Sequence, residues 1–430
     1  MSGKKQILCL LLVFAALSGC APQKEASNSA NTITVWHWMT DREPAFRELA
    51  KRYEAKTGIK VRFELYAPSE EYSQKVRAAA QGVNLPDIFG ILGEKMDFAS
   101  FIKAGHVLNL YNYMAADNFK WRDRFYAKAL AVNEFPSGNT YGVPPGYYAV
   151  PIDVMTIQML YNKELLKKLN SEPPKNLQEL IDIGKKIKAA KMQGLVSGWG
   201  EIALIDCFAN NYAFNIMGKD KVLATIKGKV PYTDPDWIRV FSLFKEMQEN
   251  GVFANGLVTM INKNAEQLFA NGRAVFAFNG SWCVNVYKGM NPDLSYGVML
   301  PPKASDKYPM SIWGGAGSSF MVNARAKNKE EAVKFLEWLT DKEQQTYLSE
   351  ATNNLPANKE SVSALSEMMA QFAQGIDSST HPNVWGVSEF TPVLEAFDKG
   401  IQSIIIGEKT PEQVASDVQR IKERELAKKK

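Results

Sequence analysis

Strand-like and helix-like segments alternate along most of this chain, and this alternation restricts the fold more than any other feature of the sequence. Residues 33–38 have a strand pattern, residues 46–53 repeat apolar side chains at helical spacing, and residues 60–65 alternate apolar and polar side chains again. A helical segment at 70–81 and a short apolar segment at 88–91 follow. Strands that alternate with helices of this length are typical of a parallel sheet covered by helices. Ligands of such sheets lie beyond the carboxyl ends of the strands.

The alternation resumes after a turn-rich interruption at residues 136–151. No internal repeat is visible, so we expect two α/β lobes, with crossovers that make each lobe discontinuous in sequence. From residue 330 onward the chain is expected to be mostly helical. The other expected elements are strands at 153–161, 274–278 and 294–300 and helices at 177–190, 202–217 and 236–250.

The N-terminus has the pattern of a secretory leader. Two lysines, Lys4 and Lys5, precede an apolar run over residues 7–17, which is shorter than the roughly 20 residues that a membrane-spanning helix needs. The run ends in Leu-Ser-Gly before Cys20, and this resembles a bacterial lipoprotein signal. The resemblance implies cleavage before Cys20 and acylation of its sulfur and its new amino group. An ordinary signal peptide is the alternative. Residues 21–31 are polar and are expected to form a tether.

Composition excludes several classes of function. The chain has 430 residues, 46% of them hydrophobic and 23% charged, which suits a globular protein of two or three domains. The formal net charge is +5 and the basic residues are dispersed, so we expect no nucleic-acid partner. The three histidines are widely spaced, and neither a metal site nor a cofactor is predicted. Two cysteines remain besides Cys9 and Cys20. We expect Cys207 and Cys283 to be buried free thiols, with one disulfide between them as the alternative.

A series of short motifs carries a resemblance over almost the whole mature chain. In order they include "LPDIF", "LYNKELL", "FANGRAVFAFNGSW", "YGVMLPP" and "GGAGSSFMV". The series resembles the extracellular solute-binding proteins of ABC importers, in the sugar-binding group that includes maltose-binding protein. This implies an α/β, two-lobed periplasmic-binding-protein fold with doubly wound sheets, discontinuous lobes and a hinge cleft. The implied division is a signal peptide at 1–19, an anchor and tether at 20–32, an N-terminal lobe at 33–145 and 300–350, and a C-terminal lobe at 146–299 and 351–430.

The resemblance also implies a function. The protein would capture a sugar or oligosaccharide in the cleft and deliver it to the permease subunits of an ABC transporter. It would act as a monomer, held through lipid on Cys20 at the outer face of the cell membrane or in the periplasm. No motif of a hydrolase or of a phosphate loop is present, so we do not expect an enzyme.

Two alternatives stay open. The first is a lipid-anchored glycan-degrading enzyme, which would need a pair of carboxylates facing each other across the cleft. The second is a binder of an anion, a polyamine or a metal chelate, which would favour an arginine cluster, or tyrosines and carboxylates, without tryptophan walls.

Candidate ligand contacts follow from the chemistry of sugars. Aromatic rings can cover the C–H face of a sugar, while carboxylates and amides bond its hydroxyls. The chain has 9 tryptophans. Trp282 is the strongest candidate, because "FNGSW" matches the family motif that places a stacking ring on the wall of the second lobe. Trp199 lies between two glycines in a loop, where an exposed ring would have no folding role. The full set of candidates is Trp36, Trp38, Asp41, Glu94, Tyr147, Tyr148, Trp199, Trp282, Trp313 and Trp385.

Overall fold

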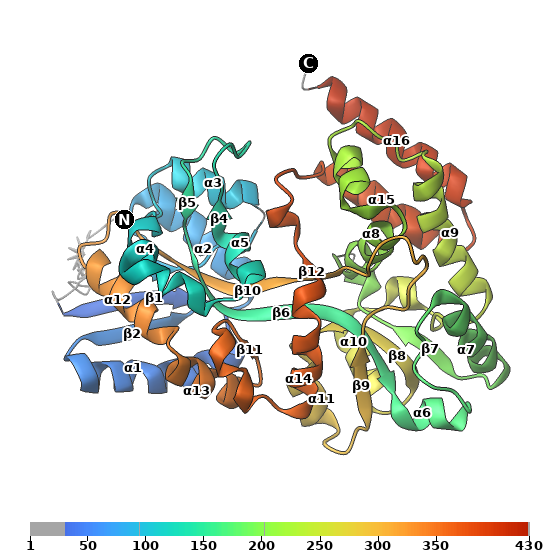
Figure 1. Cartoon of the computed structure of the whole chain (residues 1–430), viewed down its shortest axis with the longest axis horizontal. Helices are drawn as coiled ribbons and strands as arrows, with labels where there is room; N and C mark the ends of the chain where they lie inside the picture. Colours follow the sequence, from blue (N-terminus) through green and yellow to red (C-terminus); the bar gives the residue numbers. More distant parts are fainter. Residues whose placement is uncertain (1–30, 94, 202, 429–430) are drawn as a thin grey trace, which may run out of the picture.

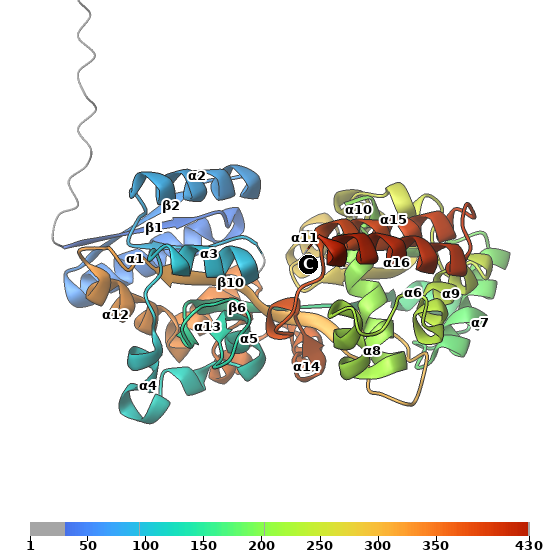
Figure 2. The ribbon, with the colours of Figure 1, turned by 90° about the horizontal axis from the view of Figure 1, so that it is seen from above.

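The computed structural model describes residues 31–93, 95–201 and 203–428, so the leader, Cys20 and Glu94 lie outside the described residues. The chain forms two lobes, joined by two long strands that run from one into the other (Figure 1; seen from above in Figure 2). This is the two-lobed α/β architecture predicted from the sequence. None of the described helices is long and apolar enough to cross a bilayer.

The first lobe is built on a parallel sheet. Strands β1 (Thr32–His37) and β2 (Lys60–Leu65) pair in parallel, and β3 (Ile88–Phe89) joins the other side of β1. Helix α1 (Glu43–Thr57) follows β1 and buries its apolar face, which confirms the strand and helix expected here. The helix ends at Gly58, which adopts a left-handed conformation with φ +74°. The lobe also contains helices α2 (Ser69–Gly82), α3 (Lys95–Lys103), α4 (Tyr111–Phe119), α5 (Ala127–Asn133), α12 (Lys329–Leu339) and α13 (Lys342–Thr352), and strands β4 (Glu134–Phe135) and β5 (Gly146–Tyr147).

The core of the second lobe is formed mainly by helices that pack against its strands. Its strands β8 (Ala274–Gly280), β7 (Gln193–Val196) and β9 (Tyr296–Met299) are covered by helices whose buried rings include Trp237, Phe244 and Phe397. Helices α7, α8 and α9 confirm the three predicted in this region. The helices are α6 (Lys163–Lys168), α7 (Leu177–Ala189), α8 (Ala203–Ile226), α9 (Pro235–Glu249), α10 (Asn262–Ala270), α11 (Cys283–Met290), α14 (Glu367–Gln374), α15 (Thr391–Ile405) and α16 (Pro411–Ala427).

Strands β6 (Val150–Asn162) and β10 (Ile312–Val322) connect the lobes (Figure 1). They pair antiparallel at their centres, with an irregular register between Ala316 and Ser319. Beyond this pairing, β10 continues onto β3 in the first lobe, while β6 continues between β8 and β9 in the second. Within the described residues one ten-stranded sheet therefore runs through both lobes, and its two middle strands are where the lobes can bend against each other.

The chain crosses between lobes later than the sequence suggested. The boundary expected at 299/300 would place a crossing there, but β9 pairs with β6 inside the second lobe and the chain crosses only in β10. The last crossing follows η5 (Lys359–Ala364), which is bonded to α13, and precedes α14, which is bonded to β9. The boundaries expected at 145/146, 299/300 and 350/351 each precede a crossing segment. They were placed at breaks in the pattern, whereas two of the crossings lie inside unbroken strands.

Candidate ligand-binding site

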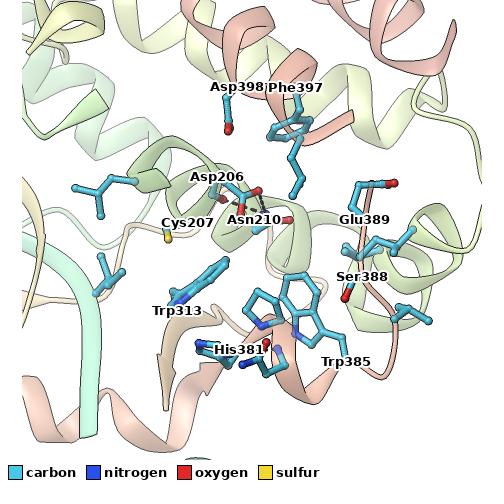
Figure 3. A pocket seen from close by; sticks show the side chains of 18 of the residues that line it. Asp206, Cys207, Asn210, Trp313, His381, Trp385, Ser388, Glu389, Phe397 and Asp398 are labelled. Atoms are coloured by element: carbon cyan, nitrogen blue, oxygen red, sulfur yellow. Dashed lines mark hydrogen bonds between the residues drawn. The ribbon is translucent and has the colours of Figure 1, made fainter. Parts of the chain in front are cut away.

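A cavity of about 610 Å³ opens where the two connecting strands enter the second lobe (Figure 3). Strand β6 contributes Met155 and Ile157, and β10 contributes Trp313. Gly93 is the contribution from the first lobe within the described residues. The remaining walls come mainly from α8, α15, the end of β8 and the chain between β12 (Ser379–Thr380) and α15, and α9 and α10 contribute Trp237 and Asn262. They include Leu204, Asp206, Cys207, Asn210, Trp282, His381, Asn383, Trp385, Glu389, Phe397 and Asp398.

Three indoles supply much of the apolar wall. Trp313 and Trp385 meet edge to face with 6.2 Å between their ring centroids, and Trp385 donates its indole N–H to Thr380 at 2.8 Å. Because that N–H is already bonded, the ring offers its apolar face to the cavity. Trp282 caps α11, is half-buried, and lies over the end of β8. A Cβ added to Gly280 would come within 2.0 Å of the Trp282 ring, so glycine is what allows the indole to lie there.

The polar groups of the cavity include three carboxylates. Glu389 is already engaged: its side chain is 2.6 Å from the Lys422 ammonium and accepts a hydrogen bond from the Tyr232 hydroxyl at 2.9 Å. Asp206 accepts a hydrogen bond from Asn210, one helical turn later on α8, at 2.5 Å. Asp398 is only 4% exposed and its Oδ1 has no hydrogen-bond partner among the described residues. Burial, and next the charge of Asp206, raise the pKa of the Asp398 carboxyl well above its ordinary range.

These carboxylates do not form the arrangement that a glycan-degrading enzyme was expected to show. Asp206 is on α8 and Asp398 is on α15, and both helices belong to the second lobe. Figure 3 shows the Asp398 carboxylate directed toward Asp206 on the same wall. A pair facing each other across the cleft would need one group from each lobe.

The candidates near the start of the chain lie elsewhere on the first lobe. The Trp36 ring packs against Tyr66, with centroids 5.2 Å apart, and Trp38 packs against Tyr72 at 5.0 Å. Asp41 has a 51% exposed side chain and approaches the Asn354 amide at 3.3 Å. In the part of the chain that the structure describes, the 610 Å³ cavity is lined by none of Trp36, Trp38 and Asp41.

The candidates in the crossover are packed into the first lobe. Tyr147 is buried and stacks on Tyr111, with centroids 6.2 Å apart. Tyr148 is buried against Phe135, and its hydroxyl donates to the carbonyl of Pro144 at 3.0 Å. Both rings therefore pack within the protein, as turn residues do.

The expectation of an exposed ring at Trp199 is wrong. The side chain is 0% exposed and packs among Phe208, Phe244 and Phe253. The loop is covered because Gln402 of α15 donates to the Trp199 carbonyl at 2.9 Å. A long-range contact of this kind leaves no mark in the local sequence. Cys207 and Cys283 are buried free thiols, as expected.

Sequence reasoning missed Asp206, Asn210 and Asp398. Two signals were available. Asp206 and Asn210 are four residues apart on a predicted helix, which places them on one face. Asp398 follows Phe397 on the apolar face of α15, between Val393 and Ile401, and a charged residue in that position is unusual.

Residues 48–374 match the family model described as bacterial extracellular solute-binding protein. The galactooligosaccharide-binding protein of Bacillus subtilis is 22% identical over 93% of this chain and 92% of its own length. The melibiose/raffinose/stachyose-binding protein of the same species is 23% identical, covering 83% and 82%.

Solved structures give the same fold. A chitin oligosaccharide binding protein superposes with a TM-score of 0.74 at 23% identity, covering 93% of this chain and 100% of that one. The solute-binding protein RafE in complex with raffinose superposes with a TM-score of 0.71 at 16% identity, covering 90% and 98%.

Proposed function

The chain belongs to the bacterial extracellular solute-binding protein family, and we propose that its cavity captures an oligosaccharide for the permease of an ABC importer. The observation that carries this proposal is the wall of three indoles, from Trp282, Trp313 and Trp385, beside a set of carboxylate and amide groups. The volume of about 610 Å³ lies within the usual range for small-molecule sites. Relatives with this architecture are described as binding raffinose, stachyose and galactooligosaccharides.

The chemistry of the walls suits a sugar. An indole face can cover the C–H face of a pyranose ring and remove both from water. The hydroxyls at the ring edge can then donate to Asp206 or Asp398 and accept from Asn210 or Asn262. Selectivity follows because a buried donor or acceptor left without a partner costs about 1–3 kcal/mol.

Delivery to a permease needs two states of the protein. The connecting strands β6 and β10 allow the lobes to bend, and a ligand that binds the closed state better shifts the population toward it. Such closure around ligands is known for periplasmic binding proteins. Small-angle scattering should show a smaller radius of gyration with saturating ligand, and an unchanged radius would contradict closure.

The location of the protein follows partly from its family. Extracellular solute-binding proteins act outside the cytoplasm. We propose in addition that Cys20 carries the lipid anchor, that residues 21–31 form the tether, and that the chain works as a monomer.

A ligand screen tests the proposal. Thermal shifts are measured with raffinose, stachyose, maltotriose, a galactooligosaccharide, a chitin trimer and their monosaccharides. A ligand at 100 times its Kd stabilises the folded state by about 2.7 kcal/mol, so a true ligand gives a clear shift. Chromatography of each mixture reports any cleavage. Absence of a shift with every sugar, or turnover of one of them, would refute a role as a sugar-capturing protein.

A further inference from the structure

The end of the cavity that lies within the second lobe is lined by apolar side chains from α8, α9, α15 and the loop between the first two. The residues that form this inner chamber are Val222, Ile226, Tyr232, Trp237, Leu394 and Phe397. Three of them are rings that pack on one another, with centroids between 4.9 and 6.1 Å apart. Figure 3 shows Phe397 across the cavity from Trp313 and Trp385. The inner chamber is therefore an apolar wall distinct from the indole wall.

A break in α8 separates the polar part of the cavity from the inner chamber. The helix is interrupted at Gly218, which adopts φ +78°. Asp206 and Asn210 line the cavity from the segment before the break. Val222 and Ile226 line it from the segment after the break, and they lie one turn apart on one helical face. A ligand that extends along α8 therefore meets hydrogen-bonding groups first and apolar groups beyond them.

The polar atoms at the inner chamber are already bonded within the protein. The Trp237 indole N–H donates to the Thr225 hydroxyl at 2.8 Å, and the Tyr232 hydroxyl donates to Oε2 of Glu389 at 2.9 Å. Oε1 of Glu389 is 2.6 Å from the Lys422 ammonium. A sugar hydroxyl placed against these rings would compete with existing hydrogen bonds, and a buried hydroxyl without a partner is costly.

Asp398 does not bring a charge to the inner chamber near neutral pH. It follows Phe397 on α15, and burial, and next the charge of Asp206, raise the pKa of its carboxyl to about 9. The Cys207 thiol on the cavity wall also stays protonated, because burial raises its pKa. The inner chamber therefore presents a ligand with an uncharged and mainly apolar surface.

We propose that the inner chamber binds an aromatic substituent carried by the captured oligosaccharide. This inference rests on the function proposed above. The indole wall and the polar groups before the break in α8 hold the sugar rings, and the inner chamber buries the substituent. Burial of apolar surface is favourable in proportion to its area, and the rings of Tyr232, Trp237 and Phe397 suit edge-to-face contact with another ring. A plain oligosaccharide offers this surface nothing but hydroxyls or water.

Calorimetric titration of the full chain with matched pairs of probes tests the proposal. The parent sugars are raffinose and the methyl glycosides of maltotriose and the chitin trimer. Each is compared with its benzoyl ester on the primary hydroxyl of the non-reducing unit, and the two trimers also with their phenyl glycosides. Burial of a phenyl-sized group is worth about 1.5–3 kcal/mol, so one aryl derivative should bind roughly 10- to 150-fold more tightly than its parent. The heat-capacity change of binding should be more negative as well.

Variants show whether the aromatic group enters the inner chamber. Leu394 is half-buried on α15, and Leu394→Phe should fill the space and reduce the ratio of aryl to parent affinity to below about threefold. Val222→Leu, which adds a single methylene, should reduce the ratio in the same direction and serves if the first variant folds poorly. Leu223→Phe is the matched control, because Leu223 is half-buried on α8 and is not among the described residues that line the cavity. It should keep both affinities.

Each outcome bears on one or both proposals. Equal affinity for every aryl derivative and its parent, or an unchanged ratio in Leu394→Phe and Val222→Leu, overturns the aromatic site while the sugar-capturing function stands. A loss in Leu223→Phe as large as in Leu394→Phe also overturns the aromatic site, because any enlarged side chain in this lobe would then have the same effect. Phenol and benzyl alcohol are titrated alone. Binding of these two without any parent sugar overturns both proposals, as does binding of no probe together with a failed sugar screen.

Discussion

Substituting Gly280 by alanine should weaken oligosaccharide binding without removing any side chain from the cavity. The added Cβ would lie 2.0 Å from Cζ3 and 2.2 Å from Cη2 of Trp282, whereas carbon atoms pack at about 3.5–4.0 Å. The indole is rigid, so it must move by roughly 1.5 Å as a unit. Trp282 packs against two hydrophobic core clusters and also lines the cavity, so the open direction for this movement is toward the cavity.

The magnitude follows from the contacts that the displaced ring gives up. A gap of about 0.5–1 Å already forfeits a quarter to a half of a dispersion contact. An aromatic anchor contributes about 2 kcal/mol or more, so the shift should cost about 1 kcal/mol, or roughly fivefold in Kd. Trp282→Ala, which removes the ring, should weaken binding at least about tenfold. Gly280→Ala should also lower the unfolding free energy by about 1–3 kcal/mol through overpacking.

Calorimetric titration beside urea denaturation measures both effects, using the oligosaccharide that gives the largest thermal shift. Gly289→Ala is the matched control. That glycine lies on the neighbouring helix α11, and a Cβ there meets nothing within 4 Å. It should keep its affinity and gain up to about 1 kcal/mol of stability from helix propensity. Unchanged affinity in Gly280→Ala would refute the reasoning, because the indole would then not be part of the binding surface.

Three further predictions concern other parts of the molecule. The unfolded carboxyl of Asp398 titrates near 3.9, and burial with a neighbouring carboxylate raises its native pKa. The stability that this carboxyl contributes is therefore complete below the unfolded pKa and is lost as pH rises through the native pKa. Between about pH 6 and about pH 9 the melting temperature of the wild type should fall by more than that of Asp398→Asn. Parallel curves of melting temperature against pH for the two proteins would contradict this. The Lys95 ammonium donates to the carbonyls of Val132 and Glu134 at 2.5 and 2.6 Å. Lys95→Met should therefore lower the free energy of unfolding, measured in urea, by about 1–3 kcal/mol. An unchanged free energy of unfolding would show that the two carbonyls find other partners. Cys20→Ser should abolish labelling with a fatty acid in cells, and a labelled variant would exclude the proposed anchor.

The local spacing of apolar side chains was sufficient to predict most of the helices and strands. The expected strand at 33–38 and helix at 236–250 correspond to β1 and α9 within one residue at each end. The reason is that side-chain spacing along a single segment already determines which face can be buried. The motif at 278–282 likewise placed Trp282 beside the cavity, because strand, glycine and ring are all neighbours in sequence.

The sequence pattern did not show where the chain crosses from one lobe to the other. Strands β6 and β10 pass from one lobe to the other as single strands, and the glycines of β10 at 314, 315 and 317 do not end it where it changes lobe. A strand that changes partners along its length keeps the same alternation throughout. Only the identity of its neighbours, which come from distant segments, shows where one lobe ends.

The same limit applies to the site. Trp199 has the local signature of an exposed loop ring, yet distant segments cover it. Asp206 and Asp398 lie far apart in the chain and gain their chemistry only when α8 and α15 pack together. The sequence by itself determined which segments fold and which family they form, because those properties depend on neighbouring residues. Tertiary structure alone decided which side chains share a cavity and which carboxyl is left without a partner, because burial and charge coupling arise only between segments brought together by folding.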